Sequence, residues 1–206
     1  MTAYGNSAGR RAAVLRARAR GGLWRRLLTR LGLASTNVRA AREAAAWEAG
    51  ADGEYSTAAQ LATLKPYGWT VLNDRAIPGA HSANADHVVI SPGGRVYLVD
   101  SKMWSAKTGP VHGAGGRLWH GPYDRGGSLR SLAFERALVE KALQAPVTAL
   151  IAVHRAPVQD DGFFVDGVPV VPADRLVMLL VANDGPRSPG AVWLAREAER
   201  LLPPYR

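Results

Sequence analysis

Apolar residues fill two short runs on either side of a Pro-Gly-Gly turn, within residues 85–102. Both runs are rich in β-branched residues, and a turn of this composition between two such runs predicts an antiparallel hairpin. Side chains two apart on a strand share one face of it. If the loop takes three residues, Val88 lies opposite Leu98, and Asp86 lies opposite Asp100 on the same face.

Two carboxylates directly opposite each other on a sheet repel, because their Cβ atoms are only ~4.5–5.5 Å apart. We therefore expect positive charge between Asp86 and Asp100. Lys102, on the same face of the second strand, supplies one charge, and a divalent metal ion with hard oxygen ligands would supply the rest. The alternative is an ordinary salt bridge at a solvated hairpin end. The apolar residues before Asp100 predict a strand buried on both faces, which favours a functional site.

The rest of the pattern predicts helices alternating with strands. Helices are expected over residues 40–49, 54–64, 128–143 and 190–202, and the glycines of residues 50–53 break or kink the chain between the first two. Strands are expected over residues 69–73, 146–153, 163–165 and 168–171, and residues 176–182 form either a strand or a helix. Glu54 would begin the second helix, where it is either a stabilising first-turn acid or a ligand of a metal ion or water.

Length and composition predict one globular domain, because 206 residues are too few for two sizeable domains with linkers. The chain has no cysteine, which excludes disulfides and thiolate metal sites. Its apolar runs have the length of strands, not of membrane spans, and its first residues lack the order of a secretory signal. We therefore predict a cytoplasmic protein.

Positive charge is concentrated at the N-terminus. Residues 1–42 hold ten arginines and no acid, whereas residues 43–206 hold 16 basic and 17 acidic residues, so +10 and −1 give the net charge of +9. We divide the chain into a basic helical arm, residues 1–42, and a domain, residues 43–206. The arm either binds nucleic-acid phosphates, attaches residues 10–33 to an anionic membrane surface, serves as a transit peptide, or packs on the domain. Its candidate phosphate ligands are Arg10, Arg11, Arg16, Arg18, Arg20, Arg25 and Arg26.

A long glycine-rich connection follows Lys102, over residues 105–127. Connections of this length in a compact domain are usually functional or mobile. Aromatic residues interleaved with cations fit a single-stranded or distorted nucleic acid, although a plain surface loop has the same composition. With the adjoining Trp104, the aromatic and cationic residues here are Lys107, Arg117, Trp119, Tyr123 and Arg125, of which Lys107, Arg117 and Trp119 are our candidate nucleic-acid contacts.

Four stretches occur in an order that resembles the nuclease-related domain (NERD) family, a branch of the PD-(D/E)xK nuclease superfamily. They are residues 50–54, 68–75, 84–89 and 99–104, and the resemblance covers about residues 48–155. It implies an α/β fold with a central mixed β-sheet flanked by helices, the restriction-endonuclease-like core, behind the basic arm. It also implies that Asp86 and Asp100 hold Mg²⁺ or Mn²⁺, that Glu54 completes the acidic cluster, and that Lys102 orients or activates the attacking water.

Two positions depart from the superfamily's pattern. Ala85 stands where a proline usually precedes the first aspartate. Residues 128–143 offer Arg130, Glu135 and Arg136 near the place where related nucleases often carry a glutamine. The expected function is metal-dependent hydrolysis of DNA, in DNA processing or defence. The alternative is a catalytically silent module that keeps the fold and binds nucleic acid or signals at a membrane.

Overall fold

The computed structural model describes residues 38–80 and 83–205. The predictions for the seven candidate phosphate-binding arginines of the arm, and for a membrane contact through residues 10–33, therefore lie outside the described residues. Within the described ranges, no helix combines the length and apolar character needed to span a bilayer.

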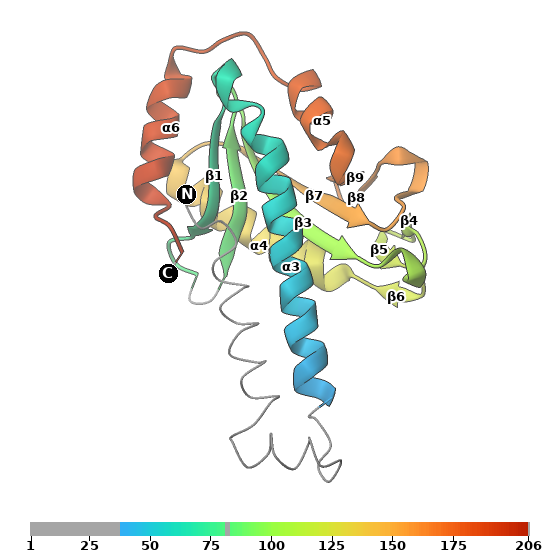
Figure 1. The fold of residues 1–206 in the computed structure, drawn as a ribbon. Coiled ribbons are helices and arrows are strands. Elements are labelled where there is room, and N and C mark those ends of the chain that lie inside the picture. Colours follow the sequence, from blue (N-terminus) through green and yellow to red (C-terminus); the bar gives the residue numbers. More distant parts are fainter. Residues whose placement is uncertain (1–37, 81–82, 206) are drawn as a thin grey trace, which may run out of the picture.

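A mixed sheet of six strands forms the centre of the domain, in the order β1-β2-β3-β7-β9-β8 (Figure 1). The strands are antiparallel toward both edges, whereas β3, β7 and β9 run parallel in the middle. Their bounds are β1 (Thr70–Ala76), β2 (Asn84–Ile90), β3 (Val96–Trp104), β7 (Val147–Arg155), β8 (Phe163–Val165) and β9 (Val168–Pro172). Both predicted hairpins are present, as β2–β3 and β8–β9.

Helices cover both faces of this sheet, which gives three layers (Figure 1). The helices α3 (Val38–Ala62) and α5 (Leu176–Ala182) pack on one face, and α4 (Gly126–Leu143) and α6 (Gly190–Leu201) pack on the other. Strand β3 joins the two cores, since Leu98 is buried with α4 and α6 whereas Val99 is buried with α3 and α5. Full burial of such a side chain stabilises the fold by about 1.5–3 kcal/mol. The predicted α/β fold, a mixed sheet flanked by helices, is confirmed.

The connection between β3 and α4 forms a sheet of its own. Its three antiparallel strands are β4 (Val111–Ala114), β5 (Arg117–His120) and β6 (Tyr123–Asp124). Val111 and Leu118 are fully buried and tie this small sheet to the core on the α4 side. Gly121 has a φ of 53°, and a Cβ there would overlap the carbonyl oxygen of Thr108, so the turn into β6 requires glycine.

Four short 3-10 helices and the C-terminal segment complete the described chain. The 3-10 helices are Lys65–Tyr67, Ala106–Thr108, Gln159–Asp161 and Ala173–Arg175. After α6 the chain returns to the edge strand β1. There the backbone N–H of Ala76 donates to the carbonyl of Pro203 at 2.8 Å, and that of Tyr205 donates to the carbonyl of Asp74 at 2.8 Å.

The predicted break between two N-terminal helices is wrong, because α3 continues from Val38 through the glycines of residues 50–53 to Ala62. A glycine inside a helix costs about 1 kcal/mol relative to alanine. At Gly53 the small residue allows close packing, since a Cβ there would lie 3.3 Å from the Cβ of Met103 on β3. Glu54 therefore lies inside a long helix and not in a first turn.

Smaller differences concern helix ends and the last undecided element. Helix α4 begins at Gly126, two residues before the predicted start at residue 128. Residues 176–182, left open between strand and helix, form helix α5.

Candidate active site

The hairpin brings two aspartates and a lysine together. The pairs Val88–Leu98 and His87–Val99 have the predicted register, and its continuation places Asp86 opposite Asp100. The β2–β3 ladder stops at His87. Beyond it, the backbone N–H of Ser101 donates to Oδ2 of Asp86 at 2.9 Å. Lys102 Nζ donates to Oδ1 of Asp100 at 2.6 Å.

Both aspartates are buried, and Lys102 is the cationic side chain that acts on them. Burial raises the pKa of Asp86 and raises that of Asp100 to about 6, against the opposing effect of Lys102. The hydrogen bond between the two carboxyls acts on them in opposite directions: it lowers the pKa of Asp86 and raises that of Asp100. Burial alone would lower the pKa of Lys102, but Asp100 and Asp86 outweigh it and hold this pKa above its ordinary value.

Glu54 joins the cluster from helix α3. Burial, followed by repulsion from Asp86 and Asp74, raises its pKa to about 8, while Lys102 acts in the opposite direction. Asp74 lies on β1 with a φ of 48°, and Asn84 Nδ2 donates to its Oδ1 at 2.8 Å. Asp74 lies within residues 68–75, one of the four stretches on which the predicted resemblance rests, but it was not predicted as part of the site.

A further carboxyl group, that of Glu135, faces the cluster from helix α4. Burial raises its pKa to about 8, and repulsion from Asp100 and Asp86 adds to this, while Lys102 opposes it. Glu135 is three residues after the buried Leu132 and four before the buried Val139. This spacing, which places it beside the inward face of the helix, was the available signal. Sequence analysis noted the residue only as a departure from the usual glutamine.

The cluster has the chemistry of a divalent-metal site. Carboxylate oxygens are the ligands that Mg²⁺ prefers, and Glu54, Asp86, Asp100 and Glu135 share one ammonium group, that of Lys102. In the part of the chain that the structure describes, no three or more His, Asp or Glu side chains are arranged as a ligand set for a metal ion. Because Lys102 bonds Asp100 directly, Lys102 Nζ competes with a metal ion for that carboxylate. The donor types fit a metal ion, and the carboxylate side chains would have to rearrange to bind it.

Behind the aspartates, on the α3 face of the sheet, five side chains form a buried polar chain. Its links are Asn73 Oδ1 to His87 Nδ1 at 2.7 Å, His87 Nε2 to Ser101 Oγ at 3.1 Å, Ser101 Oγ to Thr57 Oγ1 at 2.9 Å, and Thr57 Oγ1 to His154 Nε2 at 2.7 Å. Burial lowers the pKa of His87 to about 3, so its ring is neutral. Because the backbone of Ser101 also binds Asp86, the buried polar chain holds that carboxylate in place.

Replacing Thr57 by valine tests this support. The change keeps the shape of the side chain but leaves Ser101 Oγ and His154 Nε2 without a partner that the structure now provides. We expect the free energy of unfolding to fall by about 1–3 kcal/mol in urea titrations. Thr57→Ser, which keeps the hydroxyl, should lose less than half as much. A larger loss in Thr57→Ser than in Thr57→Val would show that the methyl group, and not the hydrogen bonds, supports the fold.

The three candidate nucleic-acid contacts of the connection lie in or beside the small sheet, apart from the hydrogen bonds of the cluster. Lys107 is exposed in the 3-10 helix Ala106–Thr108, and Arg117 pairs with Asp124 at 3.4 Å. Trp119 Nε1 donates to the carbonyl of Ala114 at 3.4 Å. Trp104, which was not among these candidates, is closer to the cluster in sequence, because it follows Lys102 by two residues on β3.

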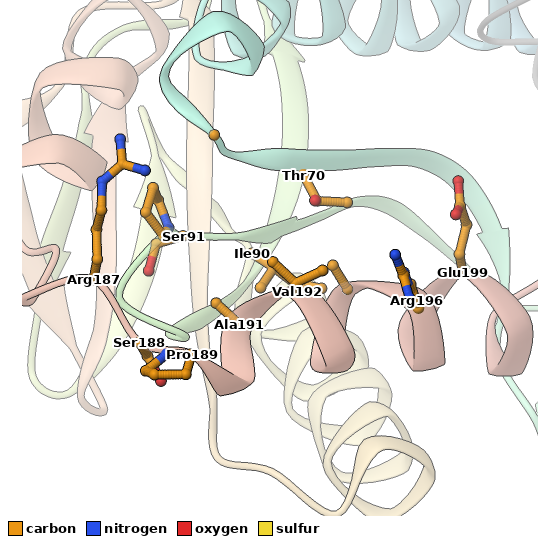
Figure 2. A pocket seen from close by; sticks show the side chains of 13 residues that line it. Thr70, Ile90, Ser91, Arg187, Ser188, Pro189, Ala191, Val192, Arg196 and Glu199 are labelled. Atoms are coloured by element: carbon orange, nitrogen blue, oxygen red, sulfur yellow. The ribbon is translucent and has the colours of Figure 1, made fainter.

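A groove of about 640 Å³ lies between β1 and α6, where Thr70, Val192 and Arg196 line its walls (Figure 2). Ser91, at the turn end of the hairpin, also lines it. Ser91 lies five positions after Asp86, which is roughly 17 Å along a strand. The groove is therefore distinct from the acidic cluster, none of whose side chains lines it.

Comparison with known proteins agrees with this geometry. The sequence model of the nuclease-related domain (NERD) matches residues 49–155, which is more than half of the chain. The chain belongs to the nuclease-related domain family. The match includes Glu54, Asp86, Asp100, Lys102 and Glu135, and it confirms the resemblance predicted over residues 48–155. Comparison with curated proteins gave no significant match, and comparison with solved structures gave none either.

Proposed function

We propose that this NERD protein hydrolyses phosphodiester bonds of DNA with the help of a divalent metal ion. One observation supports the proposal most: carboxyl groups from α3, β2 and β3 meet around a single ammonium group in a largely buried cluster. In this proposal Asp86 and Asp100 hold Mg²⁺ or Mn²⁺ and Glu54 completes the acidic cluster. Family membership points to nucleic acid as the substrate, and the location in the cytoplasm remains a prediction.

Burial, followed by repulsion from neighbouring carboxylates, raises the pKa of Glu54, and burial against the opposing effect of Lys102 raises that of Asp100. A divalent cation would supply positive charge that favours the ionised form of both groups. A metal ion bound here would neutralise phosphate charge and make hydroxide available near neutral pH. Lys102 would have to release the oxygen of Asp100 that it now bonds. Metal binding would then free its ammonium group to face the substrate.

The expected roles of the side chains follow from their protonation. Because its pKa is held above the ordinary value, Lys102 stays charged, and it is suited to orient water and stabilise developing negative charge rather than to remove a proton. Glu54 has a pKa of about 8 without a metal ion, and a divalent cation beside it would lower this pKa and favour the ionised carboxylate that completes the acidic cluster. The buried polar chain fixes Asp86 through Ser101.

The second candidate function is a catalytically silent module that binds nucleic acid or signals at a membrane surface. One observation favours it: Lys102 bonds Asp100 at 2.6 Å, and no ligand set for a metal ion is formed within residues 38–80 and 83–205. A chain that had lost catalysis would be stable in this arrangement, since the ammonium group replaces a metal ion as the partner of the carboxylate.

A cleavage assay separates the two functions. Supercoiled, linear, single-stranded and flap DNA would each be incubated with the full chain in Mg²⁺, Mn²⁺ or EDTA, beside a Lys102→Ala preparation purified in parallel. We expect cleavage by the wild type in Mg²⁺ or Mn²⁺, none in EDTA, and only background in the variant. Equal cleavage in both preparations would identify a contaminating nuclease and reject the proposal.

Glu135→Gln tests whether the additional carboxyl group sets the pH range of the site. Removing it takes away a group whose pKa is about 8 and which repels Asp100 and Asp86. Below this pKa Glu135 keeps its proton, so the wild type and the variant differ in charge only in the alkaline range. We therefore expect equal profiles below about pH 7, and above about pH 8 a rate that falls in the wild type relative to the variant, because ionised Glu135 would repel Asp100, Asp86 and phosphate. Rates would be measured from pH 5.5 to 9, with Glu199→Gln on the exposed side of α6 as a control outside the cluster. A constant ratio of the two rates over this range would show that Glu135 does not titrate near the site.

A further inference from the structure

The small sheet β4–β6 supports a stack of rings that starts beside the candidate site. Trp104 follows Lys102 by two residues, so both side chains lie on the same face of β3. The Trp104 ring stacks on His120, with ring centroids 5.3 Å apart and planes 14° from parallel. His120 is buried, and its Nε2 lies 3.0 Å from the carbonyl oxygen of Ser105, which fixes the ring.

Arg125 extends this stack toward the solvent. Its Cζ atom lies 5.6 Å from the centroid of the Trp104 ring and 5.8 Å from that of Tyr123, both within the range of cation–π attraction. Tyr123 is 58% exposed, so its ring is held from inside and is open to the solvent. We call Trp104, His120, Arg125 and Tyr123 the aromatic stack.

Positive charge surrounds the aromatic stack. Residues 105–130 hold four cationic residues (Lys107, Arg117, Arg125 and Arg130) and one acid (Asp124), a net charge of four minus one, or +3. The domain of residues 43–206 as a whole has a net charge of −1, so this segment differs in sign from the rest of it. This positive segment follows the acidic cluster directly in sequence. A polyanion that the cluster repels would therefore be attracted to the segment.

We propose that the aromatic stack binds an unpaired nucleotide strand, with a base on the Tyr123 ring and neighbouring phosphates at Arg125 and Arg117. An exposed ring supported by cations is the arrangement by which proteins hold single strands, because every base offers a π-face once it is unpaired. A base inside a duplex cannot reach the ring. This inference rests on the proposed function and adds that the strand beside the site is single-stranded, as at a frayed end or flap.

The test measures strand binding without cleavage. Fluorescence anisotropy in Ca²⁺ would compare the full chain and its variants on a 12-nucleotide DNA strand, the same RNA strand, and the blunt DNA duplex. Tyr123→Ala should weaken binding of the DNA strand by about fivefold to a hundredfold. It should change duplex binding by less than about twofold, and Tyr123→Phe, which keeps the ring, should bind like the wild type. Because the arginines of residues 1–42 remain in every variant, a difference in affinity between variants reflects the change at residue 123.

Two controls make the result decisive. Trp193→Ala removes another exposed aromatic ring, 65% exposed on helix α6, outside the small sheet, and should leave all affinities unchanged. A strand carrying 5-iodouracil should crosslink to Tyr123 in the wild type. Equal losses on strand and duplex, or crosslinks elsewhere only, would overturn the inference. A larger loss on the RNA strand would identify RNA as the preferred source of the unpaired strand.

The proposed function can fail separately. A Tyr123 effect on the strand, without cleavage in any metal, would reject hydrolysis but keep strand binding. Metal-dependent cleavage with an unchanged Tyr123→Ala affinity would keep hydrolysis and reject the aromatic stack as its strand-binding surface.

Discussion

Lys102→Ala is expected to lower the rate of metal-dependent DNA cleavage by about 10²- to 10³-fold, the usual effect of removing one group that stabilises developing negative charge. The same change should leave Mn²⁺ affinity equal or improved, because Lys102 Nζ now bonds Asp100 at 2.6 Å and competes with a metal ion for it. Cleavage rates and Mn²⁺ titrations on the same preparations separate catalysis from metal binding.

Lys102→Arg is the informative companion variant. Arginine keeps the positive charge but spreads it over a planar fork that is not equivalent to a compact ammonium group. We therefore expect partial activity, between the wild type and Lys102→Ala. Urea unfolding should exclude global unfolding as the cause of any loss. Cleavage by Lys102→Arg that is no faster than cleavage by Lys102→Ala would show that positive charge in another shape does not replace the ammonium group.

His87 should make the metal-free protein less stable in acid. Its pKa is about 6.5 in an unfolded chain and about 3 in the folded state, where burial opposes its charge. Between these values only the unfolded chain takes up the proton, so stability is complete above pH 6.5 and is lost as the pH falls toward 3. The full effect is roughly 5 kcal/mol, of which about 2 kcal/mol appears between pH 6.5 and pH 5.

His87→Gln isolates this contribution. Glu54 and Asp100 have raised pKa values in the folded state and act in the opposite direction, favouring the fold as the pH falls. The comparison must therefore be made between the two proteins at each pH, by urea unfolding in EDTA at pH 7 and pH 5. The wild type should lose about 2 kcal/mol more than the variant over this interval. Parallel losses would mean that the histidine is protonated in the folded protein.

The hairpin could be predicted because its information is local. The turn residues fix the loop length, the two-residue period fixes the faces, and together they determined that Val88 lies opposite Leu98 and that Asp86 faces Asp100. Glu54 was connected to this hairpin through the family resemblance, since nothing in its own surroundings indicates the distant strands. The family assignment and the α/β fold are confirmed, whereas the catalytic roles remain predictions.

The features that were missed depend on contacts between distant segments. Gly53 looks like a helix breaker in isolation, but Met103 packs against it and the helix continues. In the sequence Glu135 is an ordinary acidic residue of a helix, and only the packing of α4 on the sheet brings it close enough to Asp100 to interact. The buried polar chain joins Thr57 to Ser101, 44 positions away, and to His154, 97 positions away, so no local pattern could reveal it.

The return of the C-terminal segment to β1 limits how the sheet can grow. An exposed edge strand invites a strand of another molecule, and proline is a residue that blocks such pairing because it lacks an N–H donor. Here Pro203 and Pro204 lie along the edge at residues 74–76, where Pro204 pairs with Arg75. The edge nearest Asp74 is therefore closed to intermolecular strand addition, which protects the protein from aggregation at the point where the sheet borders the acidic cluster.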